Sequence, residues 1–230
     1  MKTVLCDPYL NDECKSRLSA MGFKVKEIPP YNRLPKPICS HPDILLFPLS
    51  DGSVLMGEDY YRANADFFDA LCVNIITDPI SPNGAYPSDV LFDALAVGNT
   101  LYGKKGFVSE KLIKAYDKFV CVKQGYVRCS VAMISDGCAV TADKGISTAL
   151  KKDGVDVLDI SAGNIVLDGY DFGFIGGAGG KISSDTYCFF GDLFTHPDGE
   201  RIYNLARDRK INAVSLSGGP LCDHGSLLVI

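Results

Sequence analysis

The sequence lacks the basic excess and the long apolar runs that mark two large classes of protein. Its 230 residues carry a formal net charge of −5. That charge disfavours nucleic acid, because a nucleic-acid footprint is a basic patch or stripe, and it also disfavours anionic membranes. No apolar run approaches the roughly 18 residues that a membrane-spanning helix needs. We therefore expect no nucleic-acid partner and no membrane partner.

Signals for export and for metal chelation are also missing. The first residues, MKTVLCDPYLNDECK, turn polar after Leu5, where a secretory signal would hold an apolar run of about 7–15 residues. The nine cysteines are scattered singly, without a C-x-x-C pair, as suits free thiols in a reducing compartment. The histidines lack zinc-type spacing. We therefore expect a cytoplasmic protein with no metal site and no cofactor.

What the sequence does contain is a repeated order of structural signals. Residues 125–146, GYVRCSVAMISDGCAVTADKGI, read as a strand, an Asp-Gly turn, a second strand and a helix capped by Asp143. Residues 41–59 show the same order around a second Asp-Gly turn. Residues 86–105 turn at Gly98 and precede a helix capped by Ser109. With the strand after each helix, the predicted unit is strand, strand, helix, strand.

The two chain ends read as the halves of a fifth such unit. The last residues, GGPLCDHGSLLVI, resemble a first strand, and KTVLCD near the start resembles a second strand. We therefore predict an α/β protein with one domain over residues 1–230, a five-fold pseudosymmetric propeller. Pairing of the termini would close its ring and remove an exposed sheet edge. The alternative is an ordinary α/β protein with one mostly parallel sheet; the recurring hairpin turns favour the ring. The units span about 39–80, 85–124, 126–161, 170–217, and 219–230 joined with 1–30.

This unit pattern resembles the pentein fold, the α/β-propeller of guanidine-modifying enzymes such as arginine deiminases, agmatine deiminases and amidinotransferases. YVRCSVAMISDGCAVT is similar to the aromatic-x-Arg-Asp strand of those enzymes, with Cys129 in the place of the aspartate. ISAGNIVLDGYDFGFIGGAGGKIS is similar to their Glu-Gly-Gly-Asp/Asn strand, with Ala162 in place of the glutamate or a glycine. LCDHGSLLVI stands where their His-x-Asp-Thr strand comes. The resemblance implies a bacterial pentein-like protein.

The resemblance also implies a central pocket for a small guanidino-type ligand and a nucleophilic cysteine near the end of the chain. The only late cysteine is Cys222, one position early against the family's His-Cys pair. Thiolate attack on a guanidinium needs an activated thiol, carboxylates that bind the N–H fork, and a proton-moving histidine. Along a strand, Cys222 and His224 share one face and Asp223 takes the other. The candidate catalytic residues are Cys222, His224 and Cys129; the candidate ligand-binding residues are His41, Asp43, Asp89, Arg128, Asn164, Asp171 and Asp223.

Each candidate also has a purely structural interpretation. Asp43 and Asp89 follow prolines and would cap turns, Arg128 would pair with an aspartate, and Cys129 would pack in the core. The glycine-rich GFIGGAGGK fits neither phosphate-loop spacing; we expect a hairpin whose glycines allow close backbone approach, for example to a ligand. The sequence thus supports either a cysteine-dependent hydrolase or transferase, or a non-catalytic binding or scaffold protein that has lost the nucleophile. A small molecule is the expected partner of both.

Overall fold

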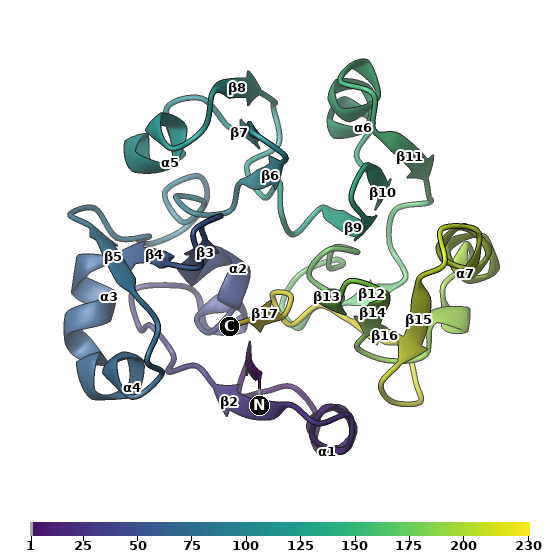
Figure 1. The fold of residues 1–230 in the computed structure, drawn as a ribbon, viewed down its shortest axis with the longest axis horizontal. Helices are drawn as coiled ribbons and strands as arrows, with labels where there is room; N and C mark the ends of the chain where they lie inside the picture. Colours follow the sequence, from purple (N-terminus) through teal and green to yellow (C-terminus); the bar gives the residue numbers. More distant parts are fainter. Residues whose placement is uncertain (1) are drawn as a thin grey trace.

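The computed structural model describes residues 2–230. The chain forms a mixed α/β fold of small separate sheets around a common centre (Figure 1). Five sheets have three strands, and a sixth pairs β12 (Ile165–Val166) with β16 (Leu221–Cys222). The three-stranded sheets are β17 (Leu228–Val229), β1 (Thr3–Cys6) and β2 (Lys24–Glu27); β3 (Leu46–Pro48), β4 (Val54–Gly57) and β5 (Ile75–Asp78); β6 (Leu95–Val97), β7 (Thr100–Gly103) and β8 (Lys118–Cys121); β9 (Val131–Ser135), β10 (Cys138–Thr141) and β11 (Asp156–Asp159); and β13 (Gly179–Ser183), β14 (Thr186–Phe189) and β15 (Asn212–Ser215).

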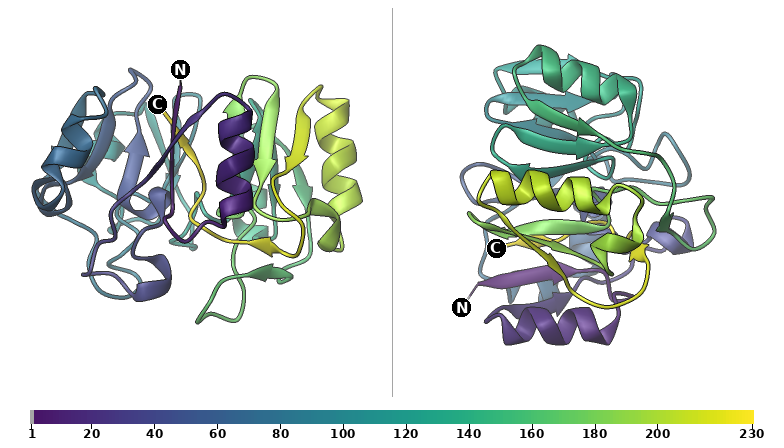
Figure 2. Two further views of the ribbon diagram at one scale, coloured as in Figure 1. Left: turned by 90° about the horizontal axis from the view of Figure 1, so that it is seen from below. Right: turned by 90° about the vertical axis from the view of Figure 1, so that its right-hand side faces the viewer.

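Every three-stranded sheet has the same internal order. Its first two strands pair antiparallel and its last two pair parallel. Because parallel neighbours need a crossover connection, helices lie between the second and third strands, at the periphery of the molecule (Figures 1 and 2). None of the helices in residues 2–230 has the length and apolar character needed to cross a bilayer. These helices are α1 (Asp12–Ala20), α3 (Glu58–Ala63) with α4 (Ala65–Asp69), α5 (Glu110–Lys114), α6 (Lys144–Lys152) and α7 (Gly199–Asp208).

The helix caps predicted from the sequence are confirmed. The Ser109 hydroxyl accepts hydrogen bonds from backbone N–H groups in the first turn of α5. The Asp143 carboxylate accepts one from the N–H of Ile146 in α6, at 2.8 Å. Each cap satisfies N–H groups that a helix start leaves without intrahelical partners, which explains why the helices begin there.

The hairpins also follow the local sequence. Asp51-Gly52 joins β3 to β4, and Asp136-Gly137 joins β9 to β10. The glycines adopt φ values of 84° and 83°, a left-handed conformation that residues with a Cβ rarely take. The two Asp-Gly pairs therefore determine where the tight turns of these hairpins form.

The two ends of the chain lie side by side. β1 pairs antiparallel with β17, with Val4 opposite Val229 and Leu5 opposite Leu228. Thr3 and Ile230 exchange backbone hydrogen bonds of 2.9 Å in both directions. The first and last residues of the described chain thus complete one three-stranded sheet. Within residues 2–230 the strand ladders do not continue from one three-stranded sheet to the next, so the sheets are separate and form no closed β-sheet.

The segments that lead into the first strands are not extended as the sequence predicted. Arg128 and Cys129 lie in a turn before β9, because the Asp93 carboxylate accepts hydrogen bonds from both of their backbone N–H groups, at 2.7 and 3.2 Å. Asp43 lies in the one-turn helix α2 (Pro42–Leu45), whose first residue is a proline, a residue preorganised for that position. His224 follows β16 instead of continuing it. Two 3₁₀ turns, η1 (Lys36–Ile38) and η2 (Leu193–Thr195), complete the fold.

Candidate functional site

The first cluster of candidate residues is a chain of side chains that runs from Asp7 through His224 to Cys222. Nδ1 of His224 lies 2.9 Å from Oδ2 of Asp7. The other Asp7 oxygen accepts a hydrogen bond of 2.6 Å from the Ser40 hydroxyl. Asp7 directly follows β1 and His224 follows β16, so the carboxylate and the imidazole come from opposite ends of the chain.

The Asp7–His224–Cys222 chain keeps the histidine charged at neutral pH. Burial alone would lower the pKa of His224, but its hydrogen bond to Asp7 and the neighbouring Cys222 raise it to about 9. Burial would raise the pKa of Asp7, but the hydrogen bonds with His224 and Ser40 hold it below its usual value. A charged imidazole therefore lies next to Cys222, whose thiol donates a hydrogen bond of 3.5 Å to the carbonyl of Pro220.

Cys222 is half-buried and borders a cavity of about 580 Å³. Asp7 and His224 line the same cavity, together with the acidic residues Asp168 and Asp223 and the basic Lys36. A thiol, an imidazole, a lysine and acidic residues thus meet around one space that is large enough for a small organic molecule.

The second cluster surrounds Cys129 and is fully buried. Sγ of Cys129 lies 3.0 Å from Oδ2 of Asp43 and 2.8 Å from Oδ2 of Asp93. Burial raises the pKa of the Cys129 thiol well above its usual value, and the two carboxylates raise it further. Burial likewise raises the pKa of Asp93 and that of Asp43. Without a cation in the cluster, Cys129 stays protonated and lacks what a nucleophile requires.

Beside the Cys129 cluster lies a smaller cavity of about 220 Å³ with aromatic walls. Tyr126 and Phe174 line it, with ring centroids 6.0 Å apart. Asp223 borders this cavity as well as the larger one. Its carboxylate accepts hydrogen bonds from the N–H groups of Phe174 and Gly225, at 2.8 and 3.0 Å, and lies 3.8 Å from Nδ1 of His41. Asp223 therefore stands in the wall between the two cavities.

The remaining candidates lie apart from the Cys222 cavity. Asp89 accepts a hydrogen bond of 2.5 Å from the Tyr126 hydroxyl, and Asp171 is at the exposed edge of the aromatic cavity. Asn164 is exposed, has a φ of 60° and lines none of the cavities found in residues 2–230. We interpret Asn164 as a turn residue, since asparagine tolerates the left-handed conformation.

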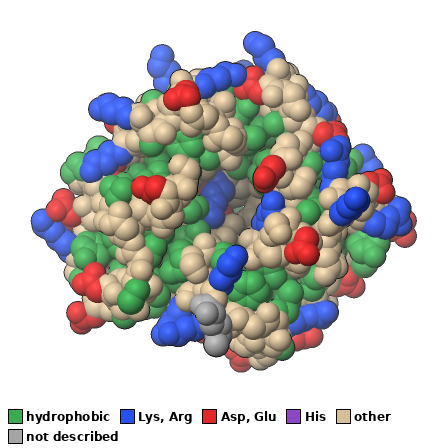
Figure 3. Space-filling view, viewed as in Figure 1, with side chains coloured by type: hydrophobic (Ala, Val, Ile, Leu, Met, Phe, Trp, Pro, Cys, Tyr) green, Lys and Arg blue, Asp and Glu red, His purple; other side chains and the backbone are tan. Residues whose placement is uncertain are grey.

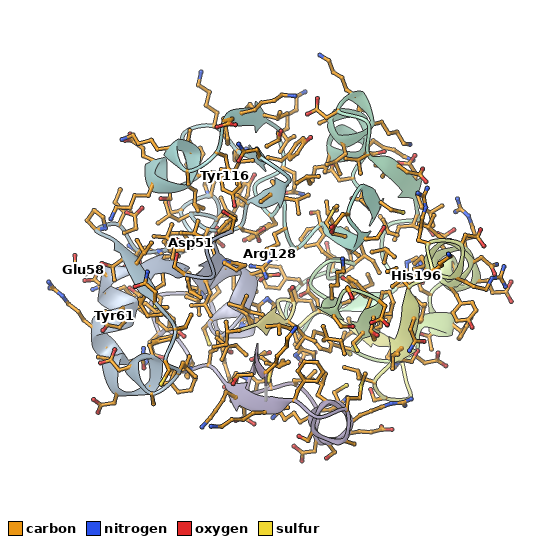
Figure 4. All side chains as sticks on the ribbon, viewed as in Figure 1. Asp51, Glu58, Tyr61, Tyr116, Arg128 and His196 are labelled. Atoms are coloured by element: carbon orange, nitrogen blue, oxygen red, sulfur yellow. The ribbon has the colours of Figure 1, made fainter. Side chains whose placement is uncertain are left out.

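Arg128 lies near the centre of the molecule, on another cavity (Figure 4). Its guanidinium donates a hydrogen bond of 3.2 Å to the backbone carbonyl of Leu46. Arg128 and Lys181 line a cavity of about 340 Å³, and Figure 3 shows Lys and Arg atoms inside the central hollow of that face. This hollow is basic, so it suits a cationic ligand less well than the acidic cavities do.

The glycine-rich segment allows close approach of a side chain and of the backbone, as the sequence predicted. A Cβ at Gly173 or at Gly177 would collide with Asp223. A Cβ at Gly176 would collide with backbone carbonyls of the turn that holds Arg128 and Cys129. The glycines thus allow Asp223 to sit between the two cavities.

Sequence reasoning missed Asp7, Asp93 and Asp168. Asp93 did carry a signal, since a lone acid in the apolar run VLFDALAV is either buried and paired or functional. Asp7 and Asp168 carried no signal of their own, because their relation to His224 and Cys222 exists only in the folded chain. The third histidine, His196, lies between η2 and α7, away from the centre (Figure 4).

This arrangement of small sheets is the fold of the pentein superfamily, so the resemblance seen in the sequence is confirmed at the level of the fold. Dimethylarginine dimethylaminohydrolase, in its adduct with 4-chloro-2-hydroxymethylpyridine, matches with a TM-score of 0.58 at 11% identity, covering 100% of this chain and 99% of that one. The Pseudomonas aeruginosa enzyme, complexed with citrulline, matches with a TM-score of 0.58 at 10% identity, over 100% and 99%. SxtG, an amidinotransferase from Microseira wollei in the saxitoxin biosynthetic pathway, matches with a TM-score of 0.56 at 11% identity, over 90% and 73%.

Within this fold class, the sequence itself identifies the family. Residues 5–228 match the model of DUF6873, described as a family of unknown function, and the chain belongs to that family. No curated protein has a sequence that matches this chain. The similar solved structures are enzymes named for reactions at guanidino or amidino groups, and at 10–11% identity they establish the fold alone.

Proposed function

We propose that the protein binds a small guanidino-type cation beside Cys222 and acts on it as a cysteine-dependent hydrolase, deiminase or amidinotransferase. The observation that carries this proposal is the Asp7–His224–Cys222 chain, which opens on a cavity of about 580 Å³. Asp168 and Asp223 line that cavity, and carboxylates are the partners that the planar N–H fork of a guanidinium requires. The kind of reaction is further supported by the similar solved structures.

The proposed chemistry assigns one task to each group. The Cys222 thiolate attacks the guanidinium carbon and forms a C–S bond. His224 gives its proton to the leaving nitrogen as the C–N bond breaks. A water molecule, deprotonated by His224, then attacks the same carbon; the C–S bond breaks and releases a ureido product and the thiolate. In a transferase, an acceptor amine takes the place of the water. Asp7 orients the imidazole and stabilises its charge.

The proposal extends to the whole molecule and to its compartment. We infer that residues 2–230 form a single five-bladed ring, because the five three-stranded sheets share one strand order and the two ends of the described chain complete the fifth of them. We also infer a cytoplasmic location, since all nine cysteines are free thiols, and a reducing compartment preserves that state.

Labelling with 2-chloroacetamidine, a small cationic alkylating agent, tests the site. We expect the reagent to modify Cys222 with saturation kinetics, and an excess of L-arginine or a related guanidino compound to slow that reaction. His224→Asn should slow it by about 100-fold or more, because the cation that stabilises the thiolate is lost. Peptide mapping by mass spectrometry identifies the labelled residue.

The chain supplies its own reference thiols for this experiment. Cys72 and Cys121 are exposed and lie outside the cavity, so they should react slowly, without saturation and without protection. Labelling of Cys222 at the same slow rate as these two thiols would refute the proposal. The matching activity assay measures ureido product from a panel of guanidino compounds, and Cys222→Ser should abolish turnover.

A second function, ligand binding without chemistry, is favoured by one observation. The aromatic cavity of about 220 Å³ is lined by Cys129, whose buried thiol is held protonated. A cation could bind there among Tyr126 and Phe174 without meeting a nucleophile. Calorimetry that shows binding of a guanidino compound by Cys222→Ser, with no turnover by the unmodified protein, would support this function over the catalytic one.

A further inference from the structure

We propose that Asp43, Asp93 and Cys129 bind a zinc ion, at a site separate from Cys222. One ligand atom from each of the three residues lies within 4.8 Å of the others. All three residues are buried, with 0%, 0% and 3% of their surfaces exposed. They come from α2, from the segment before β6 and from the turn before β9, so the fold converges on this point from three units.

The hydrogen bonds of the cluster leave it unsatisfied without a cation. Sγ of Cys129 makes short contacts of 3.0 Å with Oδ2 of Asp43 and 2.8 Å with Oδ2 of Asp93, so three potential ligand atoms crowd one point. In addition, Oδ1 of Asp43 is buried and has no hydrogen-bond partner among the described residues. A buried acceptor without a partner is costly. A divalent cation between the sulfur and the carboxylate oxygens would satisfy all of these groups at once.

The surroundings hold the three groups in place for a common ligand. Oδ1 of Asp93 accepts hydrogen bonds from the backbone N–H groups of Arg128 and Cys129. The other oxygen, Oδ2, lies against Sγ of Cys129. The backbone N–H of Asp43 donates to the carbonyl of Gly225, at 3.0 Å. The Arg128 guanidinium donates a hydrogen bond to the carbonyl of Leu46, at 3.2 Å. Outer contacts of this kind orient metal ligands.

The chemistry of the donors selects the metal. Magnesium and calcium take oxygen ligands, whereas zinc accepts thiolate, imidazole and carboxylate together. Three protein ligands leave a fourth tetrahedral position, as in zinc sites with an exchangeable ligand. Cys129 lines the aromatic cavity of about 220 Å³, which provides both an entry path and room for a water or small ligand at that position.

The test uses the full-length protein with zinc and with cobalt as probes. Protein purified without chelators should contain about one zinc per chain by mass spectrometry of the metal. Replacement by Co²⁺ should produce a thiolate-to-cobalt charge-transfer band in the near ultraviolet. Cys129→Ser should abolish the band, and Asp93→Asn should weaken zinc binding by about 100-fold.

Matched controls separate this site from other thiols. Cys138→Ser replaces another buried free cysteine, in β10, and should keep the charge-transfer band. Cys222→Ser should also keep the band. The zinc proposal can therefore be tested even if the catalytic proposal for Cys222 fails. A band that persists in Cys129→Ser, or that disappears in Cys222→Ser, would overturn the proposal.

One measurement does not depend on how well a variant folds. X-ray absorption of the zinc-loaded unmodified protein should show one sulfur at about 2.3 Å and otherwise lighter oxygen or nitrogen ligands. A coordination shell with no sulfur or with several sulfurs, or a folded protein that takes up no zinc, would contradict the assignment.

Discussion

At the scale of single residues, the two cysteines proposed from the sequence have opposite surroundings. Cys222 is half-buried and lies beside an imidazole that is charged at neutral pH. Cys129 is buried between two carboxylates, which raise the pKa of its thiol. The first environment places a thiol beside a proton carrier, as the proposed chemistry at Cys222 requires, and the second favours a neutral thiol or a metal-bound thiolate. The same residue type therefore supports two different chemistries.

The ion pair between Asp7 and His224 predicts a pH-dependent stability. Since the pKa of His224 rises from 6.5 to about 9 on folding, its contribution is fully present below pH 6.5 and is lost as the pH rises through about 9. The shift corresponds to roughly 3 kcal/mol of unfolding free energy. Urea titrations at both ends of this range should show that loss.

Asp7→Asn provides the control for this pH dependence. The amide cannot stabilise the imidazolium, so the variant should lose stability at pH 6.5 and change much less between pH 6.5 and 9. The ring protons of His224, followed by NMR, should titrate at lower pH in the variant. An unchanged titration would show that Asp7 does not hold the proton on His224.

The candidate site was predictable from the sequence only in part. Cys222 and His224 are two residues apart in the sequence, which predicted that they lie near each other, although His224 follows β16 and does not share a strand face with Cys222. Asp7 lies 217 residues away from His224, and Asp43 lies 86 residues away from Cys129, so no spacing rule relates these partners. The fold alone brings them together, which is why a zinc site was not expected from the sequence.

At the scale of elements, local rules predicted the hairpins and caps but not the turns that carry the site. Asp136-Gly137 and the Ser109 cap are determined by neighbouring residues. The segment at Arg128 reads as extended, yet it folds into a turn because the distant Asp93 carboxylate accepts its N–H groups. A long-range contact of this kind overrides a local preference.

The glycine-rich segment before β13 gives a prediction at this scale. In Gly177→Ala, the new methyl group would collide with Asp223, so we expect a loss of about 1–3 kcal/mol of unfolding free energy. Displacement of Asp223 should also weaken the protection of Cys222 by guanidino compounds. Gly218→Ala is the matched control, since a Cβ there meets nothing within 4 Å. Equal stability of the two variants in urea titrations would contradict this account.

At the scale of the whole molecule, the two ends of the described chain pair with each other and complete one three-stranded sheet. β17 covers the edge of β1, and Leu227 and Leu228 are 4% and 3% exposed. Such an arrangement protects an edge that could otherwise pair with another chain. The repeated unit in the sequence predicted this pairing. One chain end supplies only a first strand and the other begins with a second strand, so the two must pair to form a complete unit.

The side-by-side termini predict that the chain tolerates circular permutation. A permutant that joins the two ends by a short Gly/Ser linker and opens at the exposed Asp51-Gly52 turn keeps every strand pair. We expect it to unfold cooperatively in urea, within about 1 kcal/mol of the unmodified protein, since only loop-closure entropy changes. Deletion of residues 227–230 removes β17 and two buried leucines, each worth about 1.5–3 kcal/mol, and should destabilise the protein by more than 3 kcal/mol. A permutant that fails to fold while the deletion variant folds normally would show that the pairing of the ends does not stabilise the molecule.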